Sequence, residues 1–114
     1  MNTTTENNKI IAEFMGWKIK NYSTPISDIV TPYGQLTENQ LKFHSDWNWL
    51  MEAVEKIESL GYWVEILGGM HNVCSIGLTN NIESFIYLDS KSKIEVVYNT
   101  CLEFIKYYNE QNKV

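Results

Sequence analysis

Residues 62–88, YWVEILGGMHNVCSIGLTNNIESFIYL, decide the fold, because hydrophobic residues change there from a helical period of 3.6 to a period of about two. Residues 62–67 have the aromatic and β-branched content of a strand. Residues 74–78 alternate between apolar and small side chains, and residues 84–88 form a third apolar run. Only short breaks rich in glycine and asparagine separate the runs, which predicts an antiparallel meander.

Amphipathic helices are predicted on both sides of this meander. The later helix should run from about Ser92 to Gln111, with Ser92 and Glu95 at the spacing of a capping box. The earlier one should begin at Ser45 as N-cap and end at Gly61. Its predicted buried stripe is made of Trp47, Leu50, Met51, Val54 and Ile57.

The N-terminal third is less regular. A short helix is predicted over residues 8–15, and residues 1–8 form a polar stretch that we expect to be a disordered tail. Prolines and a glycine punctuate residues 17–43, where only one short strand, near residues 18–22, is predicted. The expected fold is therefore one α+β domain over residues 9–114. It should be a three- or four-stranded antiparallel sheet covered by three helices, as an α/β/α-type sandwich.

Composition and charge narrow the function classes. The 114 residues are 44% hydrophobic, which is typical of a globular domain, and their net charge is -5. All nine basic residues are lysines, so the chain lacks the arginines that usually contact phosphates and guanine, and nucleic-acid binding is not expected. A lysine can still hold one phosphate of a small ligand. No signal peptide or membrane-spanning segment is evident, which predicts a cytosolic protein without a membrane partner.

The sequence offers no recognisable catalytic or metal-binding set. Cys74 and Cys101 are distant from each other, and we interpret them as buried free thiols rather than a disulfide. The two histidines, His44 and His71, fall in predicted loops or element ends without the spacing of zinc ligands. The Gly68-Gly69 pair lacks the rest of any phosphate-binding motif. We therefore expect neither enzymatic activity nor a metal or cofactor.

Three segments resemble a known family: IIAEFMGW at residues 10–17, WNWLMEAVEKIE at residues 47–58, and the helix from SKIE at 92–95 through EFIKYYN at 103–109. Together they are similar to the small "phage ABA sandwich" domain proteins of bacteriophages and prophages. The resemblance covers most of the chain but contains no catalytic signature. It implies an α/β/α-layered fold and action in the cytoplasm of an infected bacterium, and it carries over no functional residues.

Aromatic residues are the remaining candidates for a site. Core packing is the simpler interpretation of Trp47, but Trp49 lies roughly 200° further around the same helix. Trp49 must therefore pack beneath the 21–43 segment or line a surface or pocket. Aromatic walls can stack a planar ligand such as adenine. The candidate ligand-binding residues are Trp17, Lys18, Tyr33, His44, Trp49, Trp63 and His71, with Lys20 as a further cation.

We hypothesise a non-enzymatic phage protein that counters host defence by sequestering a small nucleotide-like immune signal. The alternative is a protein–protein inhibitor of a host enzyme, acting through an acidic, aromatic surface. An enzyme that degrades the signal would need a general base, for which only His44, His71 or a carboxylate such as Asp46 is available. Homo-oligomerisation is compatible with any of these functions, because a small domain can build a site across a two-fold axis.

Overall fold

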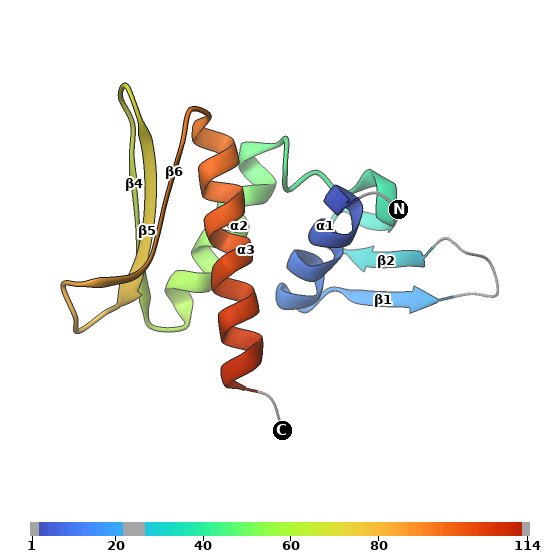
Figure 1. Ribbon diagram of the computed structural model, residues 1–114. Coiled ribbons are helices and arrows are strands. Elements are labelled where there is room, and N and C mark those ends of the chain that lie inside the picture. The colour runs from blue at the N-terminus through green and yellow to red at the C-terminus, as the bar shows by residue number, and fades with distance from the viewer. Residues whose placement is uncertain (1–2, 22–26, 113–114) are drawn as a thin grey trace.

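The fold consists of two small antiparallel sheets with helices packed between them (Figure 1). The computed structural model describes residues 3–21 and 27–112. The first half of the chain contains α1 (Thr3–Phe14), β1 (Lys18–Asn21), β2 (Ser27–Thr31), β3 (Gly34–Thr37) and the 3-10 helix η1 (Glu38–Gln40). The second half contains α2 (Trp47–Ser59), β4 (Tyr62–Leu67), β5 (Asn72–Leu78), β6 (Ser84–Ser90) and α3 (Lys93–Gln111).

The meander predicted from residues 62–88 is confirmed as the sheet β4–β5–β6, in which both pairings are antiparallel. Val64 lies opposite Ile76 and Ile66 opposite Cys74, so these side chains share the face that packs on the core. A register shift at Ile76/Gly77 accommodates one extra residue at the start of β6.

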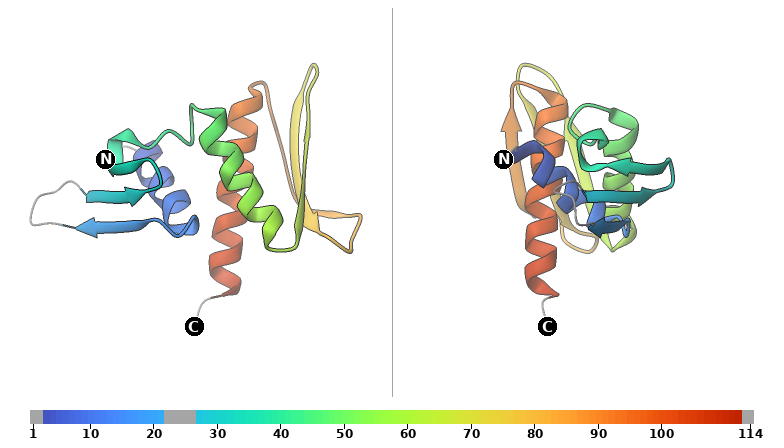
Figure 2. Two further views of the ribbon diagram at one scale, coloured as in Figure 1. Left: turned by 180° about the vertical axis from the view of Figure 1, so that it is seen from behind. Right: turned by 90° about the vertical axis from the view of Figure 1, so that its right-hand side faces the viewer.

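Helices α2 and α3 cover one face of this sheet, with α3 against β5 and β6 and α2 against β4 (Figure 2). The remaining helix, α1, packs against α3 and not on the other face of the sheet. The α+β class is therefore confirmed, but the α/β/α layering is not. Among the described residues no helix covers the outer face of β4–β5–β6, because α1 and the N-terminal strands pack on the far side of α2 and α3.

Residues 17–43 contain more regular structure than predicted. The expected strand at residues 18–22 is present as β1, whose described extent ends at Asn21. Strands β2 and β3 were not predicted, and they join β1 in a second antiparallel sheet. The sequence hides this hairpin because its two-residue connection is Pro32–Tyr33 rather than an asparagine–glycine or aspartate–glycine pair.

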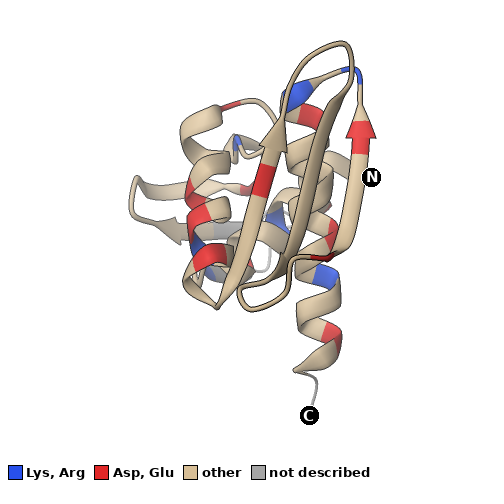
Figure 3. Cartoon of the chain, turned by 90° about the vertical axis from the view of Figure 1, so that its left-hand side faces the viewer, with Lys and Arg blue, Asp and Glu red and all other residues tan. Residues whose placement is uncertain are grey.

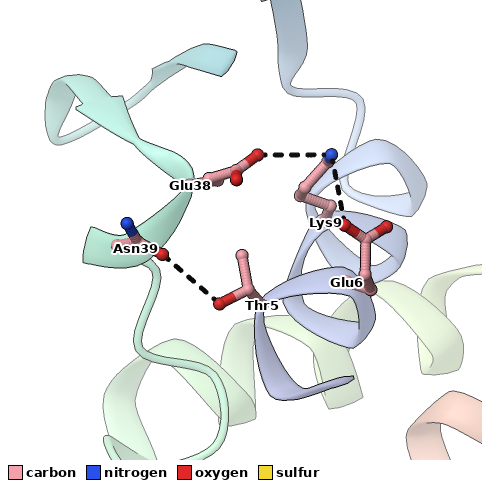
Figure 4. Close-up of polar contacts among 5 residues, drawn as sticks. All are labelled: Thr5, Glu6, Lys9, Glu38 and Asn39. Atoms are coloured by element: carbon pink, nitrogen blue, oxygen red, sulfur yellow. Dashed lines mark hydrogen bonds and ion pairs between the residues drawn. The ribbon is translucent and has the colours of Figure 1, made fainter. Parts of the chain in front are cut away.

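The N-terminal boundary also differs from the prediction. Residues 3–8, expected to be a disordered tail, form the first half of α1, and both Thr5 and Asn8 are buried. Side-chain contacts with η1 explain the difference (Figure 4). The Thr5 hydroxyl donates to Asn39 Oδ1 over 3.4 Å, and Lys9 pairs with Glu38 at 3.3 Å. Polar residues that look like a tail in sequence are thus held by tertiary contacts.

Helix α2 is rotated relative to the prediction. Trp49 is 8% exposed and belongs to the core, whereas Trp47, predicted to be buried, is 40% exposed. The N-cap is Asp46 rather than Ser45, and its carboxylate accepts from the backbone N–H of Asn48 at 2.9 Å and of Trp49 at 3.4 Å. The cap therefore fixes the first turn that carries both tryptophans.

Replacing the cap should lower stability measurably. Asp46→Ala removes the acceptor of two helix-terminal N–H groups, and we expect it to lower the free energy of unfolding by about 1 kcal/mol. Ser45→Ala is the matched control and should change it by less than about 0.5 kcal/mol. Urea denaturation followed by circular dichroism measures both. Equal effects of the two substitutions would mean that Asp46 does not cap α2.

One continuous core joins the helices to both sheets. Its fully buried large side chains include Ile11, Ile29, Leu41, Phe43, Leu50, Ile57, Ile76, Val96, Val97, Phe104 and Ile105. The predicted free thiols are confirmed, because Cys74 and Cys101 are buried and unpaired. Burial raises the pKa of Cys74 to about 11, despite a hydrogen bond with Thr100 that lowers it. Burial, with a smaller effect of Cys74, also raises the pKa of Cys101, so neither sulfur is a thiolate at neutral pH.

Candidate functional site

The most prominent surface feature of the N-terminal half is an aromatic stack at the tip of the β2–β3 hairpin. The ring of Tyr33 stacks on that of Trp49, with centroids 4.9 Å apart and planes 12° from parallel. Thr31 shapes the tip, since its hydroxyl donates to the Gly34 carbonyl at 2.8 Å and accepts from the Tyr33 N–H at 2.9 Å. The hairpin therefore delivers Tyr33 to the side of α2.

Two further rings hold Trp49 in place from below. Trp17 and Phe43 meet it edge to face, at centroid distances of 5.6 and 5.3 Å. Both supporting residues are buried, whereas Tyr33 is 49% exposed. Trp49 thus packs beneath the segment that contains Tyr33 and Phe43, which was one of the two placements considered for it. The exposed surface of the cluster is provided by Tyr33.

Glu52 fixes the position of the Tyr33 ring. The Tyr33 hydroxyl donates a hydrogen bond to Glu52 Oε1, one helical turn after Trp49. This hydrogen bond raises the pKa of Tyr33, and desolvation and the negative charges of Glu52 and Asp46 add to the effect. The hydroxyl therefore stays protonated at neutral pH and remains a donor to the carboxylate.

A pocket of about 510 Å³ opens beside this stack. Its volume is within the range that holds drug-sized or nucleotide-sized molecules. The pocket is lined by Tyr33, Leu36, Asn39, Gln40, Lys42 and Trp49. We call it the Tyr33 pocket.

A second wall of the Tyr33 pocket is polar and contains Asn39, Gln40 and the cation Lys42. Asn39 Oδ1 accepts from Thr5, and Gln40 Oε1 accepts from the Thr37 N–H at 2.9 Å, which leaves both side-chain NH₂ groups as donors. In the described part of the chain no carboxylate pairs with the Lys42 ammonium. The pocket can therefore offer a stacking surface, two amide donors and one positive charge to the same ligand.

The structure brings together only some of the predicted site residues. Trp17, Tyr33 and Trp49 belong to one aromatic cluster, but only Tyr33 and Trp49 line the pocket, because Trp17 is buried beneath them. Lys18, although adjacent to Trp17, is exposed at the start of β1 and does not line the pocket, and the side chain of Lys20 lies outside the described residues. Leu36, Asn39, Gln40 and Lys42 were not predicted. Their only signal in the sequence is proximity to Tyr33 and Phe43, because the elements that carry them were not recognised.

His44 belongs to a separate polar network. Its Nδ1 lies 3.0 Å from Asn8 Nδ2, and the same amide nitrogen donates to the Leu41 carbonyl at 3.2 Å. The Tyr98 hydroxyl donates to Asn8 Oδ1 at 2.9 Å, and burial raises the pKa of Tyr98 to about 12. This network ties α1 to α3 and to the residues before α2. His44 thus contacts the buried Asn8 side chain and does not line the Tyr33 pocket.

Trp63 and His71 lie on the second sheet and also do not line the Tyr33 pocket. The Trp63 ring covers Gly77 on the neighbouring strand so closely that a Cβ at residue 77 would lie 2.4 Å from it. Its indole N–H donates to the Asn81 carbonyl at 2.7 Å, so Trp63 anchors the β5–β6 turn. His71 is exposed in the β4–β5 turn.

Within the described residues, no group of three or more His, Cys, Asp or Glu side chains is arranged to hold a metal ion. None of the helices in the described residues is both long and apolar enough to cross a membrane. Comparisons with protein-family models, with curated proteins and with solved structures give no match, so none of them links the chain to the phage ABA sandwich proteins.

Proposed function

We propose that the protein is a non-enzymatic binding protein that sequesters a small, planar, nucleotide-like molecule in the Tyr33 pocket. The observation that supports this proposal best is the exposed Tyr33 ring, which is pre-positioned by Trp49 and Glu52 beside Lys42, a lysine without an ion pair among the described residues. A ring held rigidly before binding loses little conformational entropy when a ligand stacks on it. The pocket supports the binding step, and the phage counter-defence role rests on the resemblance to the phage proteins.

The chemistry of the walls narrows the ligand class. Tyr33, Leu36 and the exposed edge of Trp49 form an apolar wall for a planar ring. The amides of Asn39 and Gln40 can donate to acceptors on the edge of a base. Among the described residues Lys42 is the only cation in the lining, and Glu52 contributes a negative charge next to Tyr33. We therefore expect a ligand with one phosphate to bind better than one with several.

Isothermal titration calorimetry with AMP, ADP-ribose and cyclic ADP-ribose tests the proposal. Tyr33→Ala should weaken binding about tenfold, because stacking on an aromatic ring contributes roughly 1–3 kcal/mol per base. Tyr33→Phe keeps the ring and should bind within about threefold of the original protein, a change of less than ~1 kcal/mol. Tyr87→Ala, on the opposite side of the molecule, is the control for general effects of aromatic truncation.

The charge contribution is tested separately. Lys42→Gln should weaken binding of AMP but leave binding of adenosine unchanged, because only the phosphate contacts the ammonium. The absence of heat and of any thermal shift with all of these ligands at millimolar concentration would refute the proposal. Binding that is indifferent to both Tyr33→Ala and Lys42→Gln would place the ligand elsewhere.

The alternative function is inhibition of a host enzyme through protein–protein contact. The observation that favours it is the outer face of β4–β5–β6, where Leu67 is 54% and Tyr87 64% exposed. Figure 3 shows few charged residues on this face, which differs from the acidic surface expected from the sequence. Native mass spectrometry of the protein purified from producing cells separates the two functions. An added mass of a few hundred daltons that is lost on denaturation supports sequestration of a small ligand, whereas a stoichiometric host enzyme supports inhibition.

A further inference from the structure

Another pocket lies along the open edge of β6. Four consecutive residues of this strand, Phe85 to Leu88, line it together with Glu103 and Tyr107 of α3, and its volume is about 500 Å³. A pocket lined by an unbroken run of one strand follows the backbone of that strand. In the sheet, β6 is a terminal strand that pairs only with β5 among the described residues. Half of its backbone N–H and C=O groups therefore point away from the sheet.

Apart from the extra residue at its start, strand β6 lacks the features that usually protect such an edge. Its seven residues, SFIYLDS, include no lysine or proline, and Asp89 is their only charged residue. The pocket provides space for side chains beside the open edge, between β6 and the flank of α3. An added strand could therefore form backbone hydrogen bonds with β6 and place side chains in the pocket beside α3.

We propose that β6 pairs antiparallel with β6 of a second copy of the chain around a two-fold axis at Tyr87, which would join two three-stranded sheets into one of six strands. In this register Tyr87 of one copy lies opposite Tyr87 of the other. Ile86 of each copy lies opposite Leu88 of the other. Both of the latter side chains already pack partly on the core. The paired strands thus match apolar side chains with apolar side chains on the inner face.

Charge complementarity selects a second copy as the partner and fixes the register. Glu83 directly precedes β6 and Lys91 directly follows it, so pairing around Tyr87 brings the Glu83 end of each strand next to the Lys91 end of the other copy. A shift of two residues toward the start of the strand would instead place Glu83 opposite Asp89, with like charges facing each other. Neither Glu83 nor Lys91 has an ion-pair partner among the described residues of its own copy.

The other open edge of the sheet does not offer this match. Strand β4 has Glu65 near its middle, and pairing around this residue would place two carboxylates opposite each other. Pairing around Val64 instead places each Glu65 opposite Trp63 of the other copy and brings no opposite charges together. The observations therefore favour β6 as the dimer edge.

Sedimentation velocity and light scattering between micromolar and millimolar concentrations should show a species of twice the 13.3 kDa chain mass. Glu83→Lys and Lys91→Glu should each weaken dimerisation about tenfold, because each turns two attractive pairs per dimer into two repulsive ones. The double variant Glu83→Lys/Lys91→Glu should restore it. The two residues lie beyond opposite ends of β6, so rescue cannot arise from a contact within one copy.

Tyr87→Lys provides an independent test, because it places two ammonium groups opposite each other at the axis and should abolish the dimer. Tyr87 is 64% exposed, so the variant should melt within a few degrees of the original protein. A chain that remains monomeric at all concentrations would overturn the proposal and leave the edge for a foreign strand. A dimer that is unaffected by Tyr87→Lys and by both charge reversals would overturn it by placing the interface elsewhere.

Discussion

Trp49→Ala should lower the free energy of unfolding by about 4 kcal/mol, whereas Trp47→Ala, two residues earlier on the same helix, should lower it by about 1 kcal/mol. Trp49 is 8% exposed and contacts Trp17, Tyr33 and Phe43. Its removal would leave a cavity bordered by three rings that cannot all move inward. Trp47 is 40% exposed, so its truncation removes less buried apolar surface than that of Trp49.

Chemical denaturation with urea, followed by far-ultraviolet circular dichroism, measures both effects on the same scale. The comparison is informative because the residue type, the helix and the substitution are the same. A larger loss of unfolding free energy in Trp47→Ala than in Trp49→Ala would contradict the helix orientation described above. It would also remove the rigid support on which the proposed ligand-binding role of Tyr33 depends.

Asn8→Ala should lower the free energy of unfolding by about 3 kcal/mol, an unusually large effect for a small polar residue. Asn8 is 2% exposed, and its side chain meets Tyr98, the Leu41 carbonyl and His44. Alanine would leave the Tyr98 hydroxyl and the Leu41 carbonyl without these partners. Buried groups that lose a hydrogen bond cost roughly 1–3 kcal/mol each.

Tyr98→Phe is the matched control, because it removes one of these hydrogen bonds and preserves the ring. It should cost about 1–2 kcal/mol, and the double variant should be less destabilised than the sum of the two single variants. Strict additivity would show that the two side chains do not interact. A loss below about 1 kcal/mol for Asn8→Ala would mean that water replaces the amide at this position.

The elements that could be predicted from the sequence are those whose pattern is decided locally. The alternation in residues 62–88 and the long apolar stripe of α3 are recognisable without knowledge of any partner, and the structure contains both. The Ser92 hydroxyl also accepts from the Glu95 N–H at 3.3 Å, as expected for the cap. The Glu95 carboxylate contacts the Ser90 hydroxyl at 3.5 Å, where a capping box predicts a contact with the Ser92 backbone.

The features that were missed depend on contacts between distant segments. Helix α2 is covered by β4 on one side and by the Tyr33 hairpin on another, so its buried surface extends beyond a single stripe and includes Trp49. The first turn of α1 is held by η1, which a sequence pattern cannot show. For the same reason the aromatic members of the Tyr33 pocket were predicted from their chemistry, whereas Asn39, Gln40 and Lys42 were not.

The hydrogen bond between Asn8 and Tyr98 also has a consequence for how the chain is made. It joins residues 90 positions apart, so α1 leaves the ribosome long before the helix against which it packs. At roughly 5–20 residues per second, synthesis of the intervening chain takes about 5–18 s. During this interval the side chains of α1 that pack on α3, such as Phe14 against Phe104, have no partner. The final docking of α1 must therefore follow the synthesis of α3.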